Sequence, residues 1–146
     1  MKISRILSLS TLAVAAIFLA ACASNGPSIS GNWQDIGTTS NGNIKASIDK
    51  SSIKRSGNLV TFRDKKTVVK TSEERYVNTP TDKTAVGTWE INCSNKTYRL
   101  SALQLLDDHG KVLINETYSS TDIRPMSVMK GTLTEKKYEA ICSRSL

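Results

Sequence analysis

Residues 85–106, AVGTWEINCSNKTYRLSALQLL, decide the fold. The first half alternates apolar or small residues with polar ones, a period-two pattern typical of a β-strand with one buried face. Ser94-Asn95 then predicts a tight turn, and a second strand follows from Thr97 to Leu106 with apolar residues on both of its faces. The stretch therefore predicts two antiparallel strands, the second of them covered on both sides. The residues expected on the buried face of the first strand are Ala85, Gly87, Trp89, Ile91 and Cys93.

Upstream of this pair, the sequence predicts further strands joined by short turns. Residues 44–48 alternate as a half-buried strand does, and Asp49-Lys50-Ser51-Ser52 predicts a turn. Residues 53–55 and 59–63 flank Ser56-Gly57-Asn58, which is a good hairpin loop. These patterns predict two more antiparallel pairs on the N-terminal side of the central stretch.

The strand that starts at Leu59 is expected to run on to Lys70, and its middle is polar on both faces. We interpret this middle as a twisted arm that projects past the core, with an edge guarded by lysines. Its basic residues are the candidates for contacting a partner. They are Arg63, Lys65, Lys66 and Lys70.

Downstream, residues 107–110 predict a turn and residues 112–118 another alternating strand. About six strands with short connections predict an antiparallel meander. The C-terminus changes to a helical period over residues 133–142, where Thr132 and Glu135 fit a capping box and Lys137 is expected to lay its stem over the edge of the apolar stripe. The fold class is therefore α+β, a single meander sheet with one helix packed on it.

The N-terminus predicts export and lipidation. Lys2 and Arg5 precede an apolar run that ends in Leu19-Ala20-Ala21-Cys22, which resembles a bacterial lipoprotein cleavage site. We expect a signal peptide at 1–21, a lipidated Cys22 with a flexible tether at 22–31, and one domain at 32–146. Ala23 favours delivery to the outer membrane. The alternative is an ordinary secretory signal with a chance cysteine beside the cut.

The chain holds three cysteines, and lipid on Cys22 would leave an even pair in an oxidising compartment. A disulfide between Cys93 and Cys142 is then the default expectation. It would tie the end of the helix to the end of the strand that Cys93 closes. The alternative is two buried free thiols.

Charge and motifs limit the classes of function. The net charge of +7 falls to +5 when the leader is removed, which favours acidic partners. No polybasic run or aromatic–basic cluster indicates nucleic acid, and an exported protein rarely meets it.

His109 is the single histidine, so no Ser–His–Asp set exists. We interpret the turn that it shares with Asp107 and Asp108 as solvated rather than as a metal site. We expect no catalysis and no cofactor.

Three stretches resemble one known family. Residues 48–61, IDKSSIKRSGNLVT, are similar to the opening hairpin of the surface-adhesin protein E family. Trp89-Glu90-Ile91-Asn92-Cys93 with Tyr98-Arg99-Leu100 resembles its middle strand pair, and Ala140-Ile141-Cys142 resembles the end of its terminal helix. The resemblance runs from about Trp33 to Cys142. It implies a six-stranded meander, a C-terminal helix clamped by a disulfide, and homodimers.

The resemblance also implies a function, because the named member of the family is a lipoprotein adhesin for host extracellular-matrix and serum proteins. The resulting hypothesis is an outer-membrane lipoprotein, attached through lipid on Cys22, that binds such host proteins without catalysis. The alternative is a lipoprotein that faces the periplasm and has a structural or assembly role in the envelope. Labelling of intact cells separates the two.

Overall fold

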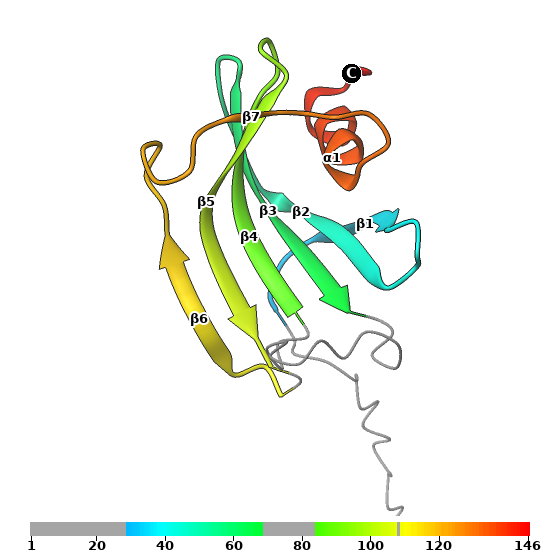
Figure 1. The fold of residues 1–146 in the computed structure, drawn as a ribbon, viewed down its shortest axis with the longest axis vertical. Coiled ribbons are helices and arrows are strands. Elements are labelled where there is room, and N and C mark those ends of the chain that lie inside the picture. Colours follow the sequence, from blue (N-terminus) through cyan, green and yellow to red (C-terminus); the bar gives the residue numbers. More distant parts are fainter. Residues whose placement is uncertain (1–28, 69–83, 108) are drawn as a thin grey trace, which may run out of the picture.

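The computed structural model describes residues 29–68, 84–107 and 109–146. Six strands form one antiparallel sheet in the order in which they occur in the chain, as predicted (Figure 1). A further strand, β7 (Met126–Ser127), pairs with β5 and was not predicted. The six strands of the meander are β1 (Trp33–Thr38), β2 (Ile44–Ser56), β3 (Leu59–Val68), β4 (Thr84–Asn92), β5 (Thr97–Leu106) and β6 (Val112–Thr117).

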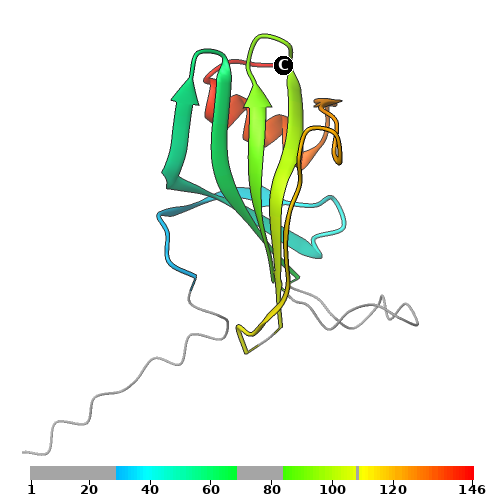
Figure 2. The ribbon, with the colours of Figure 1, turned by 90° about the vertical axis from the view of Figure 1, so that its left-hand side faces the viewer.

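The single described helix, α1 (Leu133–Cys142), has the predicted bounds. Thr132 caps its N-terminus by accepting a hydrogen bond from the Glu135 amide at 3.1 Å. The Glu135 carboxylate accepts one at 2.6 Å from the amide of Gly131, the residue before the cap, rather than from the Thr132 amide that a capping box would use. Figures 1 and 2 show α1 over the end of the sheet where the β2–β3 and β4–β5 hairpins turn. We call the face that it covers the helix face and the opposite one the outer face.

The core lies between α1 and the helix face of the sheet. Tyr138 is fully buried, and its hydroxyl donates to the Cys93 carbonyl at 2.9 Å. The predicted disulfide between Cys93 and Cys142 is confirmed, with a Cα–Cα distance of 5.6 Å. The helix is thus fixed to the sheet by apolar packing and by a covalent bond. The buried core residues are Ile48, Val60, Phe62, Ile91, Cys93, Val128, Tyr138 and Ile141.

The turn predicted at residues 49–52 is wrong, because β2 continues through it as one strand. The pairing register between β2 and β3 instead shifts between Asp49 and Lys54. Asp49 does accept the Ser51 amide at 3.0 Å, as an aspartate in a turn would. The strand continues past this bond, since β3 pairs with β2 on both sides of the register shift.

The projecting arm predicted for residues 63–66 is also wrong. β3 is an internal strand, paired with β2 along one edge and with β4 along the other as far as Thr67. Its charged middle is accommodated by ion pairs, because Arg63 bonds Asp49 and Asp64 bonds Lys137. Lys137 does not lay its stem over an edge as predicted. It is only 1% exposed, with its ammonium group held inside the protein.

Several predicted features lie outside the described residues. These are the signal peptide at 1–21, the lipid-bearing Cys22 with most of the tether, and Lys70.

Candidate binding faces of the sheet

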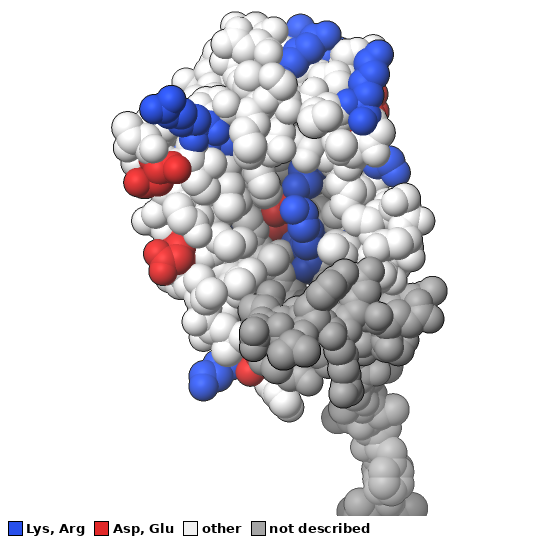
Figure 3. Space-filling view, in the orientation of Figure 1, with Lys and Arg blue, Asp and Glu red and all other residues white. Residues whose placement is uncertain are grey.

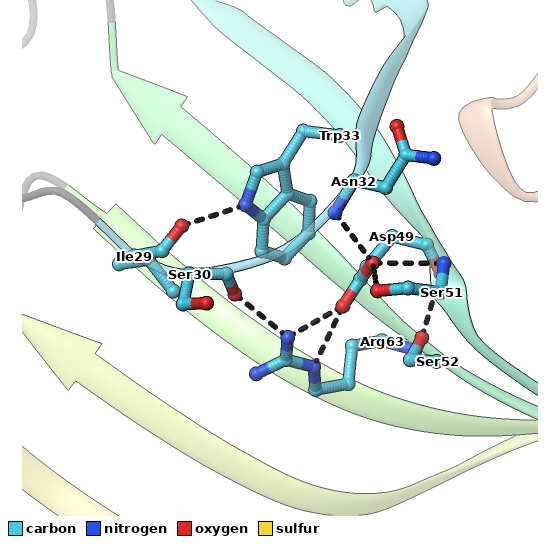
Figure 4. A network of polar contacts seen from close by, with 8 residues as sticks. All are labelled: Ile29, Ser30, Asn32, Trp33, Asp49, Ser51, Ser52 and Arg63. Carbon is cyan, nitrogen blue, oxygen red and sulfur yellow. Dashed lines mark hydrogen bonds and ion pairs between the residues drawn. The ribbon is translucent and has the colours of Figure 1, made fainter.

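The outer face carries a hydrogen-bonded network centred on Asp49, which is 0% exposed (Figure 4). Its Oδ1 accepts from the amides of Asn32 at 2.9 Å and Ser51 at 3.0 Å. Its Oδ2 accepts from Arg63 through Nε at 3.2 Å and Nη2 at 2.5 Å. Burial alone would raise the pKa of Asp49, but the hydrogen bonds from Ser51, Arg63 and Asn32 outweigh it and lower the pKa to about 2. The carboxylate therefore stays charged while buried.

Trp33 lies beside this network and carries two cations on its ring. The guanidinium carbon of Arg63 is 5.5 Å from the ring centroid, and the ammonium of Lys65 is 4.6 Å from it. The indole N–H donates to the Ile29 carbonyl at 2.8 Å, and Arg63 also donates to the Ser30 carbonyl at 2.9 Å. These bonds fix the orientation of the ring. We call Trp33, Arg63 and Lys65 the Trp33 cluster.

The two cations of the Trp33 cluster are not equivalent. Arg63 forms an ion pair with Asp49, whereas Lys65 forms no ion pair with any carboxylate of the described residues. Burial and the nearby Lys45 ammonium lower the pKa of Lys65 below its ordinary value. Lys45 is itself paired with Asp35 at 2.8 Å. Lys65 is therefore the group on this face best placed to gain from an added anion.

The helix face holds a second cluster around Trp89. The Oδ1 atom of Asp64 accepts from the Trp89 indole at 2.7 Å and from the Gly87 amide at 3.2 Å, while its Oδ2 pairs with Lys137 from α1. The Lys137 ammonium lies 4.4 Å from the centroid of the Trp89 ring, and the Lys66 ammonium lies 5.3 Å from it. We call Asp64, Lys66, Trp89 and Lys137 the Trp89 cluster.

The buried ion pair has opposing influences on its lysine. Burial lowers the pKa of Lys137, the charge of Asp64 raises it, and the neighbouring Lys66 lowers it further. The net pKa is below the ordinary value of a lysine. Both side chains are 2% exposed, so the charges stabilise one another in a part of the protein that water does not reach.

Gly87 makes this arrangement sterically allowed. A Cβ atom at this position would lie 2.5 Å from the Trp89 indole nitrogen and 2.7 Å from Asp64 Oδ1. Both distances are too short for a carbon atom, so the hydrogen bond between Asp64 and Trp89 requires a glycine at position 87.

The sequence-predicted binding residues are divided between the two faces. β3 alternates, so Arg63 and Lys65 lie with Trp33 on the outer face and Lys66 lies with Trp89 on the helix face. Sequence reasoning did not find the two tryptophans as partners of these cations. It also missed the bond between Asp64 and Lys137, which lie 73 positions apart. The sequence did contain one indication of this bond. Asp64 follows Val60 and Phe62 in the alternate-position series of one strand, and Lys137 falls in the apolar stripe of the helix.

No group of three or more His, Cys, Asp or Glu side chains that could hold a metal ion exists in the described part of the chain.

Comparison with known proteins supplies the family. The model of the family described as "Surface-adhesin protein E" matches residues 33–143. No curated protein sequence matches the chain significantly.

Solved structures of protein E from Haemophilus influenzae share the fold. A structure of its crystal form II is 13% identical with a TM-score of 0.52, covering 82% of this chain and 93% of that one. Protein E from non-typeable Haemophilus influenzae is 15% identical with a TM-score of 0.50, covering 82% of this chain and 80% of that one. Identities this low establish a common fold alone. The family match spans all the strands of the sheet and α1, and the chain belongs to the surface-adhesin protein E family.

Proposed function

We infer that the protein is a lipid-anchored adhesin of the outer membrane, and that it binds host extracellular-matrix or serum proteins through the outer face of its sheet. Membership of a surface-adhesin family supports a non-enzymatic binding protein at the cell surface. The observation that carries the choice of face is the ammonium of Lys65, held 4.6 Å from the Trp33 ring with no carboxylate of the described residues to neutralise it.

The Trp33 cluster has the chemistry to contact an acidic segment of another protein. Lys65 supplies a charge, and Trp33 supplies a flat apolar surface beside it, a pairing common in protein interfaces. Arg63 has a different role, because its guanidinium already bonds Asp49 and the Ser30 carbonyl. It holds the ring and the strand in position for Lys65. The net charge of +5 without the leader speeds the approach of an acidic partner.

Lys66 and Lys70 enter the proposal differently. Lys66 lies on the opposite face, so one flat partner that contacts Lys65 does not reach it. Lys70 stays in the proposed binding set on sequence grounds.

The homodimer that the family resemblance implies would present two Trp33 clusters and raise avidity toward a repetitive matrix. Sedimentation of the purified protein tests that state.

Attachment to the membrane is proposed through lipid on Cys22. The one helix among the described residues has ten residues, too few to span a bilayer. Metabolic labelling with palmitate should mark the wild-type chain, and Cys22→Ser should abolish the label. A labelled Cys22→Ser chain would contradict the anchor.

The orientation of the domain decides between adhesin and envelope component. Antibody against the purified domain should label intact cells, and protease added outside should remove the domain. Labelling that appears only after permeabilisation would contradict the adhesin proposal and favour the periplasm-facing alternative.

A further inference from the structure

The helix face contains a row of residues beyond the end of the sheet that α1 covers (Figures 1 and 2). Lys66 lies directly opposite Ala85, Ala85 opposite Leu105, and Leu105 opposite Ile114. Directly opposed residues of antiparallel strands point to the same face, so these four side chains form one line across β3, β4, β5 and β6. Ala85 and Leu105 are half-buried and Ile114 is 40% exposed. The row begins with a cation and continues as an apolar strip.

The charge at the head of the row is not balanced. The Trp89 cluster has two ammonium groups, on Lys66 and Lys137, and one carboxylate, on Asp64. Both oxygens of that carboxylate are occupied, Oδ1 by Trp89 and Gly87 and Oδ2 by Lys137. Lys66 contacts no other carboxylate of the described residues, and it is half-exposed. The cluster therefore carries one unit of positive charge at a position that a solute can reach.

Figure 3 shows basic side chains in the middle of the helix face, with acidic atoms beside them. The row from Lys66 to Ile114 crosses three strand spacings, which is about 14 Å. That length suits an extended acyl chain of medium length lying across the strands.

We propose that this row binds a monocarboxylate amphiphile of the fatty-acid type, with its carboxylate on Lys66 and its chain along Ala85, Leu105 and Ile114. A single negative charge neutralises the excess of the Trp89 cluster. The indole N–H of Trp89 already bonds Asp64, so the donors offered to the ligand are those of the Lys66 ammonium. The site lies on the opposite face from Lys65, and it is independent of the proposed host-protein contact.

The test uses dodecanoate as the probe and the full chain carrying Cys22→Ser, so that no acyl group is attached to the protein. The chain has two tryptophans, one in each cluster, and their indole N–H signals in NMR report on the two faces separately. Dodecanoate should shift the Trp89 signal saturably and leave the Trp33 signal in place. Acetate, which lacks the chain, and dodecanol, which lacks the charge, should shift neither.

Matched variants test the residues. Lys66→Gln should weaken binding at least about tenfold, the loss expected when one charge-assisted hydrogen bond is removed. Lys65→Gln makes the same charge change on the other face and should leave the affinity unchanged, and Ile114→Ser should weaken binding by shortening the apolar strip. A Trp89 signal that does not move with dodecanoate would overturn the proposal. So would equal losses in Lys66→Gln and Lys65→Gln, because these would show attraction to net charge without a site.

Discussion

Two aspartates and the cations bonded to them determine how β3 lies in the sheet. Asp64 follows Val60 and Phe62 at alternate positions, so the period of the strand directs its carboxylate into the core. A buried carboxylate needs partners, and it finds Lys137, Trp89 and the Gly87 amide. On the outer face, the buried carboxylate of Asp49 is likewise paired with a cation, that of Arg63.

Removing the charge of Lys137 should destabilise the protein. Lys137→Met leaves Asp64 charged and buried without its counterion, so the free energy of unfolding should fall by about 3 kcal/mol in urea titrations. Lys136→Met is the matched control, because the neighbouring lysine is exposed, and it should change stability by less than about 0.5 kcal/mol. Equal losses of unfolding free energy in the two variants would contradict a specific contribution of the Asp64–Lys137 pair to stability.

Gly87→Ala should break the hydrogen bond between Asp64 and Trp89. The new methyl group would overlap both partners, so we expect a loss of about 2 kcal/mol of stability. The indole N–H signal of Trp89 should also move, since its acceptor is displaced. An alanine variant with wild-type stability and an unmoved signal would refute the steric account.

Asp49 should make stability depend on acid. Its pKa in the folded protein is about 2, below the value near 3.9 of an unfolded aspartate. The stabilisation is therefore complete above about pH 4 and is lost as the pH falls toward 2. The pKa values of Asp35, Asp107 and Asp122 are also lowered, so the informative quantity is a difference between proteins. Thermal melting from pH 5 to pH 2 should show a shallower decline for Asp49→Asn than for wild type, and parallel declines would contradict this role.

Among the elements, those specified locally were predictable. The bounds of α1 follow from its period and its N-terminal cap, and the β2–β3 hairpin follows from Ser56-Gly57-Asn58, where Gly57 has a φ of +60°. The turn at Asp49 and the arm at residues 63–66 were mispredicted because polar runs resemble solvent-exposed chain. Whether such a polar run is exposed depends on strands and a helix that are distant in the sequence. Asp64 and Lys137 lie 73 positions apart, so no short stretch of sequence contains both.

The disulfide should be the main restraint on α1. It joins residues 49 positions apart, and closing such a loop is worth about 4 kcal/mol in the chain-entropy model. Replacing both Cys93 and Cys142 by serine should lower the free energy of unfolding by an amount of that order. Amide hydrogen exchange should increase most in α1, while β3 and β4 remain protected longest. Uniform loss of protection in all elements would show that the helix is not a separate unit.

For the whole molecule, the sheet offers two chemically different faces. The outer face presents Lys65 on Trp33, whereas the helix face is partly covered by α1 and presents Lys66 on Trp89. The sequence pattern grouped Arg63, Lys65 and Lys66 in one arm, whereas the structure divides them between the two faces. The pattern could not separate them, because the tryptophans that divide them lie on β1 and β4.

Binding of cells that carry wild-type and variant protein to immobilised host extracellular-matrix proteins tests the adhesin account most directly. Lys65→Glu should reduce adhesion about tenfold, since it reverses the charge at the proposed contact. Lys130→Glu makes the same change at an exposed position on the loop before α1 and should leave adhesion at the wild-type level. Adhesion that is unaffected by Lys65→Glu, or equally reduced by both substitutions, would contradict the assignment of the outer face as the binding surface.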